Sequence, residues 1–210
     1  MAFFCGMALH IRIHPETPQP RLVRQVVEAL DQGAVIVYPT DTIYGLGCSI
    51  RHQKSIERIA RIKRIDPAKA NLSFICPDLS DLSKYARQLD TPQYRLLKKY
   101  LPGPYTFILN ASREVPKILQ TKKSTIGLRV PDHPIAQMLL QELGNPILSA
   151  SLPDHEGTDM TDPEEIAHAF DKLVDIVVDG GICGLEPSTI VDLTDSIPEV
   201  TRQGKGEWYE

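Results

Sequence analysis

A short apolar run followed by a polar loop constrains the fold of this chain more than any other feature. Residues 34–38 read Ala-Val-Ile-Val-Tyr, which predicts a buried strand because β-branched and aromatic residues favour strands. Pro39 cannot donate a ladder hydrogen bond, so we expect the strand to end there. Residues 40–42, Thr-Asp-Thr, then lie at the strand end, where α/β sheets commonly carry sites. Gly45 and Gly47 are expected to give a ligand access to the backbone, although an ordinary strand-to-helix connection is the alternative.

Segments with helical and strand periodicity alternate along the remaining chain, without repeats or a linker. This alternation predicts one α/β domain over residues 8–210, preceded by a flexible tail at residues 1–7. Thr161 and Glu164 have the spacing of a capping box at the start of an acidic helix. The expected helices cover residues 20–31, 53–64, 79–86, 91–101 and 135–143. The expected strands cover residues 72–76, 105–109, 125–130, 147–150, 174–178, 189–192 and 199–202.

The composition favours a cytoplasmic protein. The four cysteines are far apart and form no Cys-x-x-Cys pair, which argues against a zinc knuckle or a disulfide framework. No apolar run approaches the length of a membrane span, and no signal-peptide pattern opens the chain. We therefore expect no membrane partner.

The formal net charge of −4 is unevenly distributed. Residues 51–69 contain seven lysines and arginines against two acids, whereas residues 154–179 contain nine acids against a single lysine. This asymmetry predicts an anionic ligand near the basic segment and a solvated acidic surface elsewhere. A basic helix face that is merely hydrated is the alternative.

Polar side chains recur at the ends of the expected strands. Arg129 alternates with Ile126, Leu128 and Val130, so its side chain should point away from the apolar face of its strand. Hydroxyls and arginines suit a carboxylate and phosphates, and a bidentate arginine grip is one that lysine cannot reproduce. We therefore expect Arg129→Lys to weaken carboxylate binding with little change in thermal stability. The four polar groups are residues 40–42, Arg129 with His133, Ser149 with Ser151, and Ser188 with Thr189.

The order of five motifs resembles that of the YrdC-type threonylcarbamoyl-AMP synthase family, and the chain is most similar to its YciO branch. These motifs are Pro39-Thr-Asp-Thr-Ile-Tyr-Gly-Leu-Gly47, Leu101-Pro-Gly-Pro-Tyr-Thr106, Gly127-Leu-Arg-Val-Pro-Asp-His-Pro134, Ser149-Ala-Ser151 and Pro187-Ser-Thr-Ile-Val-Asp192. The resemblance covers nearly the whole chain from about Ala8. It implies a single YrdC-like α/β domain, with a twisted open mixed sheet, helices on its faces and a concave basic cleft.

The resemblance also implies a reaction and its site. Family members join L-threonine, bicarbonate and ATP into threonylcarbamoyl-adenylate and release pyrophosphate, for threonylcarbamoyl-adenosine formation in tRNA. ATP enters as a Mg²⁺ complex, and no protein-bound metal is implied. The matching threonine-side positions are Thr40, Arg129, His133, Ser188 and Thr189. The matching nucleotide-side positions are Lys63, Arg64, Ser149, Ser151 and Arg202, with Lys63 and Ser149 implied in catalysis.

Three positions depart from the family pattern. Ile65 stands where a Lys-x-Arg signature beginning at Lys63 has arginine, Ser151 stands where asparagine is expected, and Asp41 replaces the usual glutamate. A lost charge-assisted hydrogen bond is worth about 1.5–3 kcal/mol, which predicts roughly 10- to 100-fold weaker triphosphate binding or turnover. The alternative is a protein that binds tRNA or double-stranded RNA without synthesis. Its expected RNA contacts are Arg58, Arg61, Lys63 and Arg64.

Overall fold

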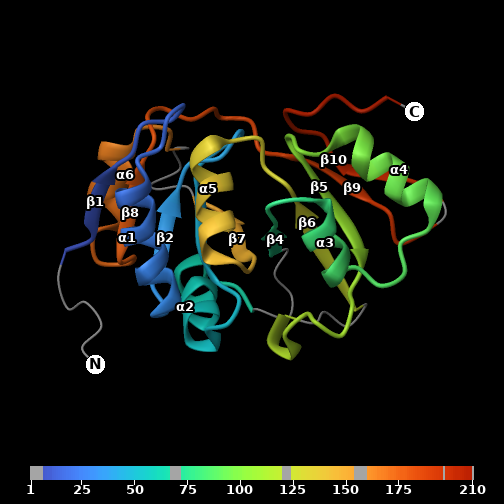
Figure 1. Ribbon diagram of the computed structural model, residues 1–210, viewed down its shortest axis with the longest axis horizontal. Coiled ribbons are helices and arrows are strands. Elements are labelled where there is room, and N and C mark those ends of the chain that lie inside the picture. The colour runs from blue at the N-terminus through green and yellow to red at the C-terminus, as the bar shows by residue number, and fades with distance from the viewer. Residues whose placement is uncertain (1–6, 67–71, 120–123, 154–159, 196, 210) are drawn as a thin grey trace.

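A single mixed sheet organises the computed structural model, which describes residues 7–66, 72–119, 124–153, 160–195 and 197–209. Within these residues the sheet has ten strands in the order β1-β8-β2-β3-β7-β4-β6-β5-β9-β10 (Figure 1). The α/β class and the open mixed sheet are therefore confirmed. The strands are β1 Leu9–Arg12, β2 Val35–Tyr38, β3 Gly45–Ser49, β4 Ser73–Ile75, β5 Tyr105–Asn110, β6 Thr125–Arg129, β7 Ile147–Ser151, β8 Ile176–Asp179, β9 Thr189–Asp192 and β10 Glu199–Arg202.

The sheet contains both parallel and antiparallel strand pairs. Strands β1, β8 and β2 run parallel, and β2, β3, β7 and β4 form antiparallel neighbours. Beyond them β4 pairs parallel with β6 and β5 pairs parallel with β9, while β6–β5 and β9–β10 are antiparallel. The helices are α1 Pro20–Asp31, α2 Gln53–Lys63, α3 Leu79–Tyr85, α4 Thr91–Tyr100, α5 Pro134–Leu143 and α6 Pro163–Phe170, with a 3₁₀ turn at Lys117–Leu119.

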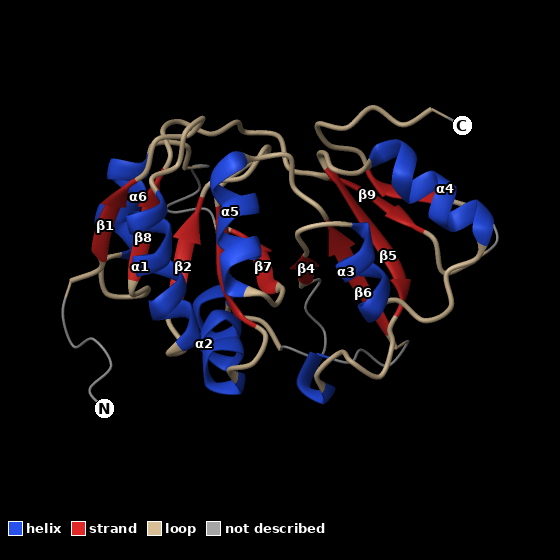
Figure 2. Cartoon of the chain, in the orientation of Figure 1, coloured by secondary structure: helices blue, strands red, loops and turns tan. Residues whose placement is uncertain are grey.

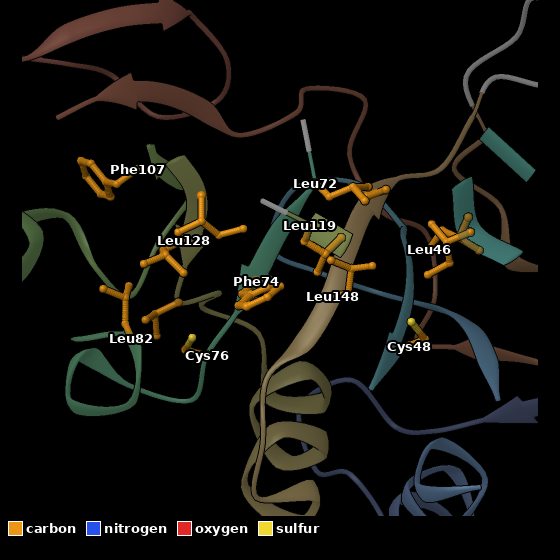
Figure 3. Close-up of a cluster of buried hydrophobic side chains, with 14 of the residues drawn as sticks. Leu46, Cys48, Leu72, Phe74, Cys76, Leu82, Phe107, Leu119, Leu128 and Leu148 are labelled. Carbon is orange, nitrogen blue, oxygen red and sulfur yellow. The ribbon is translucent and has the colours of Figure 1, made fainter. Parts of the chain in front are cut away.

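Helices pack against the sheet (Figure 2). The apolar side chains of the sheet and helices form two cores. Because side chains alternate along β2, Ile36 packs into a core beneath α1 and α5, while Val35 and Val37 join the larger core on the other face. Figure 3 shows part of the larger core, in which Phe74 of β4 and its cross-strand partner Leu128 of β6 project to the same side of the sheet as Leu82 of α3. None of the helices in the described residues is long and apolar enough to cross a membrane.

The helix boundaries follow from local chemistry. Helix α1 begins at Pro20 as expected, and α5 ends at Leu143 and is capped by Gly144, which takes a left-handed conformation with φ of 64°. The capping box expected from Thr161 is wrong. Pro163 occupies the first turn of α6, so the N-cap is Asp162, whose carboxylate accepts a hydrogen bond from the Glu164 backbone at 2.8 Å.

Strand β3 corrects the expectation that Gly45 and Gly47 keep a loop open for a ligand. Both glycines lie in this strand, which is antiparallel to β2. A Cβ at Gly47 would lie 2.8 Å from the Tyr38 ring and 2.7 Å from Ile147 Cγ2, and one at Gly45 would lie 3.0 Å from the Tyr38 hydroxyl. The glycines therefore make room for a tyrosine ring.

The end of the described chain, residues 203–209, crosses the β9 side of the sheet and is called here the C-terminal strap. Thr189 Oγ1 donates to the Gly206 carbonyl at 2.6 Å, and the Trp208 ring stacks on Tyr100 of α4 with centroids 4.6 Å apart. Lys205 Nζ donates to the Asp41 carbonyl at 2.6 Å. The strap thus joins α4 and β9 to the loop after β2. At the other end, residues 1–6 of the expected tail lie outside the described residues.

Candidate functional site

A cavity of about 690 Å³ opens over the centre of the sheet. Its floor includes Ser149 of β7, Ser73 of β4 and Gly127 of β6, which pair side by side in register. On the same face of β7 and β4, Ile147 and Ile75 belong to the core beneath α1 and α5. The cavity therefore lies on the same face of the sheet as this core. The strand positions at the cavity carry serine or glycine, whereas those beneath the helices carry isoleucine.

Arg129 forms the most buried charged part of the wall. Its Nη2 donates to Asp41 Oδ1 at 2.5 Å and to Thr42 Oγ1 at 3.0 Å, and the side chains of Arg129 and Asp41 are 9% and 11% exposed. Arg129 Nε and Asp41 Oδ2 are buried and have no hydrogen-bond partner among the described residues. Such unpaired atoms are costly. The ion pair therefore leaves one donor and one acceptor unsatisfied beside the cavity, which Arg129 lines and Asp41 adjoins through this contact.

The Thr40 hydroxyl is committed to its own loop. It donates to the Ile43 carbonyl at 2.6 Å and accepts from the Thr42 backbone N–H at 3.2 Å, while the two threonine hydroxyls lie 3.1 Å apart. A hydroxyl has one hydrogen to donate and two lone pairs. Thr40 lines the cavity, and these contacts position Thr42 beneath Arg129.

His133 lies at the start of α5, where its side chain makes no capping hydrogen bond. Its Nδ1 is buried without a partner in the described chain. Burial lowers the pKa of His133 below 6.5, and the carboxylates of Asp41 and Asp132 oppose this shift. His133 does not contribute to the cavity lining, although Asp41 lies close enough to influence it.

The expected nucleotide-side residues approach the cavity from three elements. Lys63 Nζ, at the end of α2, donates to the Ser151 carbonyl at 2.7 Å. Ser149 Oγ accepts a 2.6 Å hydrogen bond from the Tyr38 hydroxyl. Arg202 donates to the Ser188 carbonyl from Nη2 at 2.6 Å and from Nε at 3.2 Å. Burial lowers the pKa of Arg202, and the nearby charge of Arg129 acts in the same direction.

The structure does not bring every expected residue into this cavity. Thr189 is fully buried and bonded to the strap, and Arg64 caps α2 in a left-handed conformation with an exposed side chain. Of the expected RNA contacts, Arg58 pairs with Asp175 at 2.6 Å and also donates twice to the Leu173 carbonyl. Arg58 therefore fastens α2 to the segment before β8.

Several lining residues were not identified from the sequence. Ser73, Thr106 and Gly127 line the cavity, and Ser188 Oγ lies 2.9 Å from Thr106 Oγ1. A small or polar residue in the middle of an apolar strand, as at Ser73 and Gly127, was the available signal. Ile65 also lines the cavity while packing against the larger core.

A second cavity of about 230 Å³ adjoins the first near Arg202 and Ser151. The two cavities share lining residues, so they form neighbouring parts of one site region. Within the described ranges no group of three or more His, Cys, Asp or Glu side chains is placed to hold a metal ion.

Comparisons with known proteins agree with this architecture. A Sua5/YciO/YrdC family model, described as "Telomere recombination", matches residues 28–204. The chain is 50% identical over 203 residues to an uncharacterized protein of Haemophilus influenzae, covering 95% of this chain and 97% of that protein. It is 48% identical over 204 residues to YciO of Escherichia coli, covering 96% and 98%. A threonylcarbamoyl-AMP synthase of Vibrio vulnificus is a more distant relative, with 32% identity over 162 residues, covering 76% and 87%.

Two solved structures extend the comparison. The crystal structure of E. coli YciO superposes with a TM-score of 0.90 at 47% identity, covering 96% of this chain and 98% of that one. Sua5 of P. abyssi, crystallised in complex with L-threonine, gives a TM-score of 0.86 at 27% identity. That match covers 94% of this chain and 58% of Sua5.

Proposed function

Because the chain belongs to the Sua5/YciO/YrdC family, we propose that it acts as a threonylcarbamoyl-AMP synthase-type nucleotidyltransferase. Its substrates would be L-threonine, bicarbonate and ATP, and its products threonylcarbamoyl-adenylate, pyrophosphate and water. The relatives named as synthases support this assignment, as does the distant relative that was crystallised with L-threonine.

The observation that carries the proposal is the pair of unsatisfied atoms in the Arg129–Asp41 ion pair. An α-amino acid carries a carboxylate and an ammonium group on the same carbon. The carboxylate would accept from Arg129 Nε, and the ammonium group would donate to Asp41 Oδ2. An amino acid is thus a ligand class that satisfies both buried atoms at once. The ammonium group must lose one proton to solvent before its nitrogen attacks the carbon of bicarbonate. As the N–C bond forms, the C–OH bond of bicarbonate breaks, and the hydroxide leaves as water with a second proton from the nitrogen.

The nucleotide would occupy the rest of the cavity. Lys63 and Arg202 line it with Arg129 and supply positive charge, and the Mg²⁺ that accompanies ATP would add to this charge. Transfer to an α-phosphate depends mainly on positioning and charge neutralisation, so no protein nucleophile is required. The carbamate oxygen would form a bond to the α-phosphorus while the bond to pyrophosphate breaks.

With isoleucine at position 65, the site should bind a triphosphate more weakly than a site with arginine at that position. Ile65 lines the cavity and supplies no hydrogen-bond donor. Ile65→Arg with Ser151→Asn should raise threonine-dependent turnover by about tenfold or more, equivalent to roughly 1.4 kcal/mol. Because Ile65 also packs against the core, thermal stability is measured alongside the rate. Equal turnover by the parent and the stable double variant would show that these substitutions do not limit the reaction.

The decisive experiment measures pyrophosphate release with L-threonine, bicarbonate and ATP. We expect release that depends on all three substrates and that Arg129→Met abolishes. Arg12→Met is the matched control, because Arg12 lies on edge strand β1 and its side chain is 88% exposed. Release by the parent that does not exceed an enzyme-free blank would remove the synthase assignment.

Binding of tRNA or duplex RNA is the second candidate. It is favoured by the exposed side chains of Arg61 and Arg64, which lie beside Lys63 at the edge of the cavity. Phosphate contacts predict an affinity that falls steeply with salt concentration. Duplex RNA binding is therefore measured at low and high salt for the parent and for Arg61→Gln with Arg64→Gln. Binding that is absent at low salt, or insensitive to salt and to the double substitution, would exclude this candidate.

A further inference from the structure

Tyr38 places a phenol hydroxyl against the floor of the cavity without being part of its lining. Its side chain is fully buried at the end of β2, and its hydroxyl donates to Ser149 Oγ at 2.6 Å. The two residues are 111 positions apart in sequence. The hydrogen bond crosses β3, because β3 lies between β2 and β7 in the sheet.

The ring of Tyr38 is confined where it crosses β3. Gly45 and Gly47 have no side chains, and a Cβ added at either would lie within about 3.0 Å of the Tyr38 ring or hydroxyl. Carbon atoms separated by this distance would repel. The ring therefore fills the space that the two glycines leave, and its hydroxyl has a fixed position beside Ser149.

The hydrogen bonds of the Ser149 hydroxyl determine its role. Burial raises the pKa of Tyr38 far above 10, so the phenol keeps its proton at any ordinary pH. Ser149 Oγ accepts the hydrogen bond from the Tyr38 hydroxyl and carries one hydrogen of its own. Among the described residues this hydrogen has no acceptor, while Ser149 itself lines the cavity. The Ser149 hydrogen is thus available to a ligand oxygen.

We propose that Tyr38 is a positioning residue that makes Ser149 a hydrogen-bond donor to a phosphate oxygen of the bound nucleotide. This inference rests on the proposed function. It adds Tyr38 to the residues of the nucleotide side and specifies that Ser149 donates, rather than accepts, the hydrogen bond to the phosphate. Arg129 lies near enough to Tyr38 to act on it electrostatically, so the Ser149 hydrogen and the guanidinium favour an anion in the same region. Tyr38 itself does not touch the ligand.

The test is a double-mutant cycle on ATP affinity, measured by calorimetry with the full chain. Tyr38→Phe keeps the ring and removes the hydroxyl, and Ser149→Ala removes the donor. We expect Tyr38→Phe to weaken ATP binding by about threefold to tenfold and Ser149→Ala by at least as much. The double variant should bind no more weakly than Ser149→Ala alone, since Tyr38 acts through Ser149.

Tyr105→Phe is the matched control. Its hydroxyl, in a partly buried hydrogen bond, donates to the Glu207 carbonyl at 2.6 Å, and Tyr105 does not line the cavity. It should lower the melting temperature about as much as Tyr38→Phe and leave ATP affinity unchanged. Thermal denaturation of all variants separates lost binding from lost folding.

The remaining outcomes distinguish failure of this inference from failure of the proposed function. If Ser149→Ala weakens ATP binding and Tyr38→Phe does not, the Ser149 hydroxyl binds ATP without help from Tyr38, and the positioning role proposed for Tyr38 is wrong. If Tyr38→Phe weakens binding equally in the Ser149→Ala background, the tyrosine acts through packing and the inference is overturned. If the parent does not bind ATP, the proposed function and this inference fail together.

Discussion

Arg129 illustrates how burial changes the role of a single side chain. Its position on β6 turns it toward the cavity, as the alternation with Ile126 and Leu128 predicts. The structure adds that both hydrogens of Nη2 are directed to the loop after β2, at Asp41 and Thr42. A guanidinium can make these contacts and still offer Nε to a ligand, whereas an ammonium group has a single nitrogen. Arg129 therefore organises the loop as well as facing the ligand.

Arg129→Lys should weaken L-threonine binding by about tenfold or more and also lower stability by about 1–3 kcal/mol. The second effect differs from the small change expected from sequence, because replacing a buried ion-paired group leaves Asp41 poorly satisfied. Calorimetry with L-threonine and denaturant unfolding measure the two effects. Arg12→Lys on exposed β1 is the control, and unchanged threonine affinity in Arg129→Lys would contradict a direct role.

His133 should contribute a pH-dependent term to stability. Because burial lowers its pKa in the folded chain below 6.5, the unfolded chain binds more protons as the pH falls through this value. The stabilisation is therefore complete above about pH 6.5 and is lost on acidification toward the lowered pKa. His133→Gln should reduce the fall in melting temperature below pH 6.5, while His168→Gln, at an exposed position of α6, should not. Parallel pH profiles for the parent and His133→Gln would contradict this expectation.

Strand β3 shows which elements the sequence could not predict. The helices were recognisable because apolar residues recur on one face and proline or glycine marks the ends, as at Pro20 and Gly144. Residues 45–49 contain two glycines and no strand-like alternation, so they read as a loop. Their strand conformation depends on pairing with β2 and β7 and on the Tyr38 ring, which are contacts between distant segments.

Two glycine substitutions should separate packing from ligand access. Gly47→Ala should cost about 1–3 kcal/mol, since its methyl group would overlap Tyr38 and Ile147. Gly127→Ala should cost less, because the nearest atom would be Ser73 Cβ at 3.1 Å, but its methyl group would reduce the space above the cavity floor. Denaturant unfolding and ATP calorimetry measure both variants. A larger stability loss for Gly127→Ala would contradict the assigned packing of Tyr38.

At the scale of the whole molecule, the site depends on strand order. Residues from the loop after β2 to the end of β10 meet around one cavity, because β3, β7, β4, β6, β5 and β9 are consecutive neighbours in the sheet. Motif order indicated that residues such as Arg129 and Ser149 belong to one site. It could not show that the Thr189 hydroxyl donates to the strap, that Arg58 forms an ion pair with Asp175, or that the Tyr38 hydroxyl donates to Ser149. Those outcomes depend on side-chain packing across the sheet.

The C-terminal strap carries the single tryptophan of the chain, which makes it an intrinsic fluorescent reporter. Trp208 stacks on Tyr100, and three residues earlier Lys205 contacts the Asp41 carbonyl at the loop that holds Arg129. A ligand that draws on Asp41 and Arg129 should alter this contact and with it the emission of Trp208. Titration with L-threonine should therefore give a saturable fluorescence change that Lys205→Met diminishes. If calorimetry records L-threonine binding while the Trp208 emission spectrum stays constant, the strap does not respond to ligand binding at the site.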